Sequence, residues 1–217
     1  MSFNLSVFKK ALRSHKGTIL SNQVAFRYVN SALLTKGIIN NPLNSLYSYG
    51  RGYRFNFPFA FPTLYLALSD FVATLEAGQN PDPLANVFDN HEKEPAIIYS
   101  IRVSGRFANL VDRKSLIELS FDPHQPEYLI PTLEWETMAL RGNRAVTHEI
   151  GQAVYDAGFD GIIYLSFPAF ELRYRYNVEI LSNMCVFMSM ENPNIPKINS
   201  CRLDIFEQDG FTEKLIK

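Results

Sequence analysis

The segment of residues 50–76 constrains the fold more than any other part of the chain. It opens with a stretch, 50–62, that holds two glycines, two prolines and five aromatic residues. The run 63–68 has the apolar and aromatic content of a strand, and 70–77 reads as a short helix that Ser69 or Asp70 can cap. Long irregular loops in compact domains are usually functional. The segment therefore predicts a loop, a strand and a helix that together carry a site.

The rest of the chain alternates between strand and helix patterns. An alternating, aromatic-rich run over 24–29 predicts a first strand that carries Arg27. The resulting fold class is α+β, with a mostly antiparallel sheet and flanking helices. Further strands are expected at 96–103, 116–119, 161–166, 177–181 and 184–188, and helices at 5–12, 133–140 and 145–157.

Length and composition indicate one globular domain over residues 1–217. Apolar residues make up 47% of the chain and charged residues 20%, which excludes a disordered or fibrous class. No run approaches the ~18 apolar residues of a membrane span. Two cysteines, Cys185 and Cys201, are too few for a disulfide framework, so a reduced cytoplasmic setting is expected.

The net charge of −1 conceals an uneven distribution. Residues 1–69 contain eight basic and no acidic residues, so they carry +8 and the remainder carries −9. An organellar transit peptide is one explanation, but the basic bias continues past any cleavable length. Nucleic-acid binding is another, although the basic residues are thinly spread. A local anionic ligand such as a pyrophosphate is the preferred interpretation.

Several common sites are not supported by the motifs. The four histidines are scattered and neither cysteine belongs to a CxxC pair, so no metal is expected. A GxSxG elbow, a P-loop and a complete Rossmann fingerprint are also missing from the sequence. The candidate site must therefore be built from other residues.

An ordered set of six short motifs resembles the RES domain family of toxins, named for an arginine, a glutamate and a serine. The resemblance covers residues 24–188, with two departures from the family pattern. Tyr53 stands where the second loop glycine is expected, and Leu165 replaces the residue, often proline, before the serine. The matching positions are Arg27 in AFRYV, Arg54 with Asn56 in GYRFN, Tyr65 in LYLAL, Glu76 in ATLEA, Ser166 in GFDGIIYLS and Asn177 in YNVEI.

The resemblance implies an ADP-ribosyltransferase-like fold and NAD+ as substrate, with no separate cofactor. It implies a toxin that cleaves the nicotinamide glycosidic bond, as an NAD+ phosphorylase or glycohydrolase, and that is restrained by a protein antitoxin of the Xre-like kind. Nucleic acid would then be contacted only through that partner. Two alternatives stay open: transfer of ADP-ribose to a protein, and a catalytically silent NAD-binding or interaction module, which Tyr53 makes conceivable.

Each matched residue has an expected role at an NAD+ site. Glu76 and Arg27 are the expected catalytic residues, because cleavage passes through an oxocarbenium-like state that needs a nearby negative charge and a held diphosphate. Arg27 and Arg54 are expected on the diphosphate and Tyr65 on a ring. Ser166 and Asn177 are expected to orient the substrate through neutral hydrogen bonds, and Asn56 is expected to be a further substrate-binding residue.

Ordinary structural roles compete with five of these assignments. Ser166 and Asn177 would otherwise simply end strands. Arg27 would otherwise pair with an acid such as Glu179, and Tyr65 would be a core ring. Glu76 would by default face solvent near a helix end.

Overall fold

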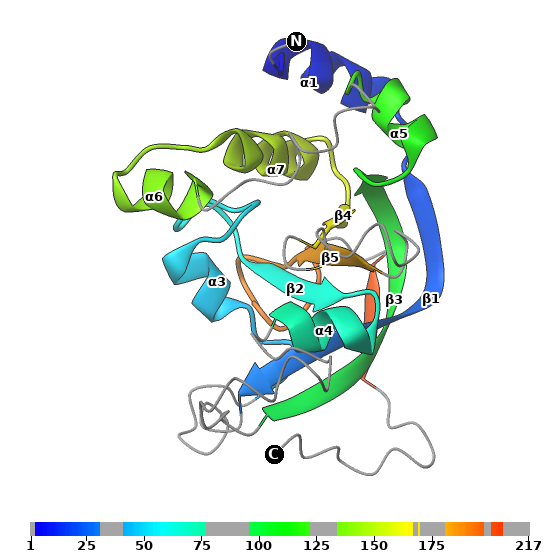
Figure 1. The fold of residues 1–217 in the computed structure, drawn as a ribbon, viewed down its shortest axis with the longest axis vertical. Coiled ribbons are helices and arrows are strands. Elements are labelled where there is room, and N and C mark those ends of the chain that lie inside the picture. Colours follow the sequence, from blue (N-terminus) through cyan, green and yellow to red (C-terminus); the bar gives the residue numbers. More distant parts are fainter. Residues whose placement is uncertain are drawn as a thin grey trace.

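A computed structural model of the protein describes residues 3–30, 41–76, 96–121, 134–166, 169, 181–197 and 201–205. Its helices and strands follow one another along the chain as the colours of Figure 1 show. In chain order they are α1 (Leu5–Ser14), β1 (Thr18–Asn30), α3 (Leu46–Arg51), β2 (Thr63–Ala67), α4 (Asp70–Glu76), β3 (Ala96–Asn109), α5 (Arg113–Glu118), α6 (Glu134–Leu140), α7 (Val146–Asp156), β4 (Gly161–Leu165), β5 (Ser182–Phe187) and β6 (Arg202–Ile205).

The six strands form a mixed sheet in the order β1-β2-β5-β4-β3-β6. An additional pairing of β1 with β3 closes five of these strands into a ring, while β6 lies along β3. β3 and β4 run parallel, and the other neighbouring strands of the described ranges run antiparallel. The predicted α+β class is confirmed, with the correction that the sheet is closed and mixed. The ADP-ribosyltransferase-like assignment stays a prediction.

The first strand is longer than its sequence pattern indicates. β1 begins at Thr18, and its register with β3 shifts between Leu20 and Gln23. Asn22 in this irregularity has a φ of 56°, in the left-handed region that asparagine tolerates better than most residues. The bulge interrupts the inside-outside alternation, and this is why only residues 24–29 read as a strand.

The strand predicted at 116–119 is wrong, because these residues belong to helix α5 or end it. Asp112 caps this helix by accepting a hydrogen bond from the Ser115 N–H at 2.8 Å. Leu116 and Leu119 lie three residues apart on one helical face and are buried. A short apolar run of this kind fits a strand and a buried helical turn equally well, so its periodicity does not decide between them.

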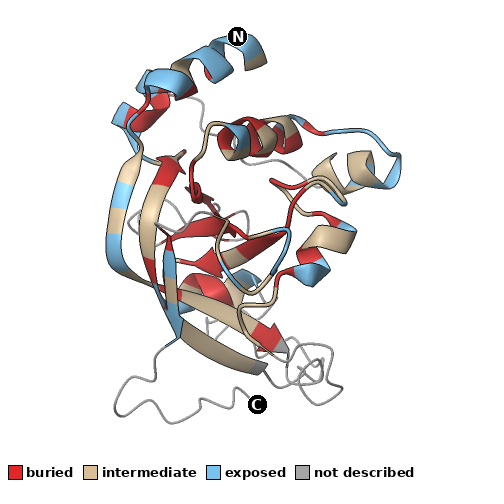
Figure 2. Cartoon of the chain, turned by 180° about the vertical axis from the view of Figure 1, so that it is seen from behind, coloured by how far each residue is buried: buried red, intermediate tan, exposed pale blue. Residues whose placement is uncertain are grey.

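The loop that precedes β2 is anchored in the core. The short helix α3, which the sequence pattern did not predict, takes up residues 50 and 51 and ends at Gly52, whose φ is 71°. Phe55 and Phe61 are then 0% and 1% exposed, and Figure 2 shows the buried residues concentrated where the helices meet the sheet. The two phenylalanines of the loop pack in one cluster with Phe8 and Leu12 of α1, Ile150 and Val154 of α7, and Ile162 and Tyr164 of β4.

Most of the remaining predicted elements agree with the structure. Strands are present near 63–68, 96–103, 161–166 and 184–188, and helices near 5–12, 70–77, 133–140 and 145–157. The strand predicted at 177–181 lies outside the described residues except for Leu181. Within the described ranges, no helix has the length and apolarity to cross a membrane.

Candidate functional site

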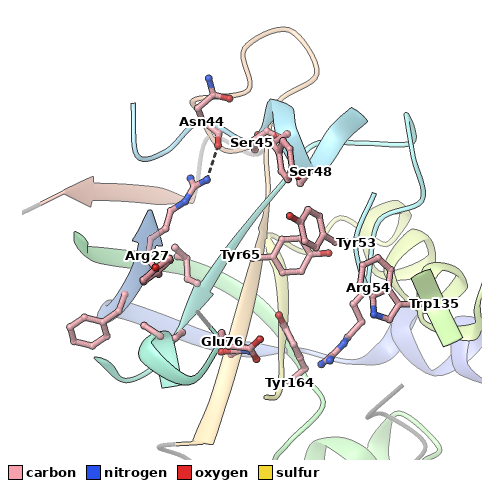
Figure 3. A pocket seen from close by; sticks show the side chains of 17 residues that line it. Arg27, Asn44, Ser45, Ser48, Tyr53, Arg54, Tyr65, Glu76, Trp135 and Tyr164 are labelled. Atoms are coloured by element: carbon pink, nitrogen blue, oxygen red, sulfur yellow. Dashed lines mark hydrogen bonds between the residues drawn. The ribbon is translucent and has the colours of Figure 1, made fainter. Parts of the chain in front are cut away.

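A cavity of about 380 Å³ opens where β1, β2, β5, α4 and α6 meet the loop after α3. This volume is in the usual range for small-molecule sites, about 300–1,000 Å³. Four of the residues singled out from the sequence line it, namely Arg27, Arg54, Tyr65 and Glu76 (Figure 3). Side chains that are up to 49 positions apart in the chain therefore face one space.

Glu76 presents a carboxylate whose orientation is fixed on one side. It is the last residue of α4, a helix that starts where Ser69 Oγ accepts a hydrogen bond from the Val72 N–H at 3.2 Å. Its Oε1 accepts hydrogen bonds from Ser166 Oγ at 2.6 Å and from Asn183 Nδ2 at 2.5 Å. Both of these hydrogen bonds reach the same oxygen, and among the described residues no donor bonds to Oε2.

The two donors to Glu76 come from the buried ends of neighbouring strands. Ser166 follows β4 and Asn183 lies in β5, where it pairs with Tyr164; they are 0% and 4% exposed. Ser166 does not line the cavity, so the structure places it behind Glu76, while Asn183 does line it. Asn177, the last residue of the predicted set, lies outside the described residues.

Arg27 brings a positive charge to the cavity wall. Its guanidinium donates hydrogen bonds to the backbone carbonyls of Pro42 and, at 2.9 Å, of Asn44. Burial lowers the pKa of Arg27 to about 10, so the group stays charged at neutral pH. No carboxylate of the described residues forms a salt bridge with it, and Glu179 lies outside them. A partly buried cation whose hydrogen bonds in the described ranges go to neutral carbonyls favours an anionic ligand.

Arg54 supplies a second cation to the cavity. Its guanidinium lies over the ring of Tyr164, with its central carbon 5.3 Å from the ring centroid, and one nitrogen donates to the Leu165 carbonyl at 3.3 Å. Within the described ranges no acidic side chain forms a salt bridge with it. The two arginines therefore place positive charge at separate points of the same cavity.

Asn56 supports the cavity wall without reaching its surface. It is fully buried, and its Nδ2 donates to the Ser48 carbonyl at 2.7 Å. The Tyr65 hydroxyl donates to Asn56 Oδ1 at 2.8 Å and accepts a hydrogen bond from the Phe55 N–H at 3.1 Å. Asn56 thus orients Tyr65, which does line the cavity.

His148 connects helix α7 to the loop that carries Tyr53 and Arg54. Its Nδ1 accepts a hydrogen bond from the Ala145 N–H, so the hydrogen on Nε2 is the one donated to the Tyr53 carbonyl, both at 3.0 Å. The ring is 1% exposed. These partners need the neutral imidazole, because a protonated Nδ1 cannot accept.

We expect this histidine to make stability depend on pH. Burial lowers the pKa of His148 from its ordinary 6.5 to about 4. Between these values the unfolded chain binds the proton and the folded protein does not, so the free energy of unfolding falls as the pH drops from 6.5 to 4. Urea unfolding across this window checks the effect. The His148→Gln variant lacks the titrating group and should lose less stability over the same window; parallel profiles for the two proteins would contradict the prediction.

Sequence reasoning missed several lining residues. Asn183 had a visible signal, since it is a polar residue directly before the apolar run 184–187 of β5. Tyr53 was noted as a departure from a motif that would either reshape the loop or stack on a base. Its ring centroid lies 5.2 Å from that of Tyr65 and 5.8 Å from that of Trp135. Trp135 and Tyr164 gave no signal at all, because aromatic residues in a helix and in an apolar strand usually belong to the core.

Comparisons with known proteins agree with this architecture. The model of the RES domain family matches residues 29–186. A chain of the crystal structure of the M. tuberculosis MbcT–MbcA toxin–antitoxin complex is similar to this chain with a TM-score of 0.54 and 14% sequence identity, over 94% of each chain. At this identity the similarity concerns the fold alone. No curated protein sequence matches the chain.

Proposed function

The chain belongs to the RES domain family, as the motif resemblance predicted, and from this premise we propose that its cavity binds NAD+ and that the protein cleaves the nicotinamide N-glycosidic bond. The observation that carries the proposal is the Glu76 carboxylate, which Ser166 and Asn183 orient in a cavity that also presents two arginines. A dinucleotide with a cationic reaction centre and an anionic diphosphate complements this charge pattern.

The chemistry needs little beyond these groups. As the bond to nicotinamide lengthens, positive charge develops on the ribose, and the second carboxylate oxygen of Glu76 would stabilise that charge or hold a ribose hydroxyl. Arg27 and Arg54 would hold the diphosphate through charge-assisted hydrogen bonds, each worth about 1.5–3 kcal/mol. Nicotinamide leaves as a neutral molecule, so the proposal requires no general acid.

The biological role we infer is that of a toxin restrained by a protein antitoxin. The family membership supports it, and so does the shared fold with a chain from a toxin–antitoxin complex. The proposal places the protein in the cytoplasm, where NAD+ and a reducing environment are found. Both cysteines are free and buried, in keeping with such a setting.

Incubation of the purified protein with NAD+ tests the reaction. We expect release of free nicotinamide, measured by chromatography, together with ADP-ribose in water or ADP-ribose 1-phosphate when phosphate is present. NAD+ labelled on the adenosine separates the alternatives, because label on a macromolecule indicates protein modification. Binding of NAD+ by calorimetry without nicotinamide release in either buffer would overturn the enzyme proposal and favour a silent binding module.

A further inference from the structure

Trp135 is the single tryptophan of the chain, and it lines the cavity from an element outside the family motifs. It lies on α6, which one contact joins to the end of α3 and another to the loop that follows. Arg51 forms an ion pair with Glu136 at 3.0 Å, and the rings of Tyr53 and Trp135 stack. A residue of α6 thereby becomes part of the cavity wall.

Neighbouring rings orient the indole. The Tyr53 ring lies 5.8 Å from it with an interplanar angle of 24°, and the His148 ring meets it edge-on at 6.4 Å and 85°. The Tyr53 backbone is itself held by His148. Two rings and a fixed loop therefore hold a large planar surface at the cavity before any ligand arrives, which reduces the entropy lost on stacking.

The position of Trp135 along the cavity indicates which part of a dinucleotide it would meet. In Figure 3, Glu76 lies on one side of Tyr164, and Arg54 and Trp135 lie on the other. In NAD+ the order of groups is nicotinamide, ribose, diphosphate, ribose and adenine. With Glu76 at the first ribose and Arg54 at the diphosphate, the group that reaches Trp135 is the adenine.

We propose that Trp135 stacks on the adenine ring of the substrate and that Tyr53, a lining residue which stands where the family pattern has a glycine, positions the indole from one side. This inference rests on the proposed function for the direction in which the dinucleotide lies. Stacking of a base on an aromatic side chain, measured by alanine substitution, corresponds to a roughly 5- to 150-fold change in affinity.

Tryptophan fluorescence tests the subsite without any turnover, because all of the signal comes from Trp135. We expect adenosine monophosphate and ADP-ribose to change the emission saturably, and ribose 5-phosphate to leave it unchanged. Quenching of free N-acetyltryptophanamide by each compound corrects for collisions. No saturable change with adenosine monophosphate, or a change with nicotinamide mononucleotide alone, would overturn the adenine assignment.

Kinetics with two substrates give a second test. Trp135→Ala should lower kcat/KM for NAD+ by roughly 5- to 150-fold and leave kcat/KM for nicotinamide mononucleotide unchanged. Trp135→Phe should restore most of the loss. Leu140→Ala, at an 85% exposed position of the same helix, is the matched control and should behave as the wild type. An equal fall of kcat/KM for NAD+ and for nicotinamide mononucleotide would mean that Trp135 has no adenine-specific role.

The two proposals fail in different ways. Saturable fluorescence change with ADP-ribose but no nicotinamide release from NAD+ would refute the reaction and retain the subsite. The opposite outcome would retain the reaction and refute the subsite. In that case the wild type releases nicotinamide but its fluorescence does not respond to ligand, and Trp135→Ala keeps the wild-type ratio of kcat/KM for NAD+ to kcat/KM for nicotinamide mononucleotide.

Discussion

Replacement of Glu76 by glutamine is expected to lower kcat for nicotinamide release by on the order of 10²- to 10³-fold, the usual cost of losing one electrostatic contact to the transition state. The amide has the shape of the carboxylate, and its oxygen can still accept from Ser166 and Asn183 as Oε1 does now. The variant therefore removes the negative charge and keeps the hydrogen bonds. Steady-state rates with NAD+ measure the loss.

Stability and binding measurements show whether this loss is chemical. The melting temperature of Glu76→Gln and its affinity for ADP-ribose should stay close to those of the wild type, because the charge acts only as the ribose becomes cationic. Full turnover by the variant would show that Glu76 is not catalytic, although the enzyme class would survive. A large drop in melting temperature would assign Glu76 a structural role instead.

Substitution of Gly151 by alanine is expected to destabilise the protein by about 3 kcal/mol or more and to impair NAD+ cleavage, since overpacking of this kind forces the backbone to move. A Cβ at Gly151 would lie 1.8 Å from the carbonyl oxygen of Phe55. Helix α7 and the loop that carries Arg54 therefore approach each other at a point where no side chain fits. Urea unfolding measures the loss of stability.

A second helical glycine provides the matched control. Gly50 lies in α3, and a Cβ there would meet no atom within 4 Å. Gly50→Ala should thus be neutral or stabilise the protein by up to about 1 kcal/mol, the ordinary effect of this change in a helix. The same change at Gly151 should lower the free energy of unfolding. If both variants gain stability, the close approach of α7 to the loop is not as described.

Local patterns in the sequence predicted much of the fold. Residues 70–77 and 145–157 were expected to be helical, and α4 and α7 lie there, because capping residues and helical spacing act over a few positions. The prediction was wrong at 116–119, where four residues do not distinguish a strand from a buried helical turn. Closure of the sheet could not be predicted, since the pairing of β1 with β3 joins segments separated by the whole of β2 and α4.

The candidate site divides in the same way. Arg27, Arg54, Tyr65 and Glu76 were singled out from motifs in chain order, and the structure brings all four to one cavity. Their direct contact with NAD+ stays a prediction. The motifs did not show which residues line the cavity and which support it from behind. Asn56 and Ser166 belong to the second group, although their motifs looked equivalent to the others.

By itself the sequence determined the family, the α+β class and the order in which the site residues arrive, because these depend on local composition and spacing. The tertiary structure alone decided which atoms meet. Ser166 and Asn183 bond to Glu76 across 90 and 107 positions of the chain. Trp135 stacks at the cavity on Tyr53, the residue that departs from the family pattern. Contacts over such separations are set by strand register and helix packing, and neither is encoded in a local pattern.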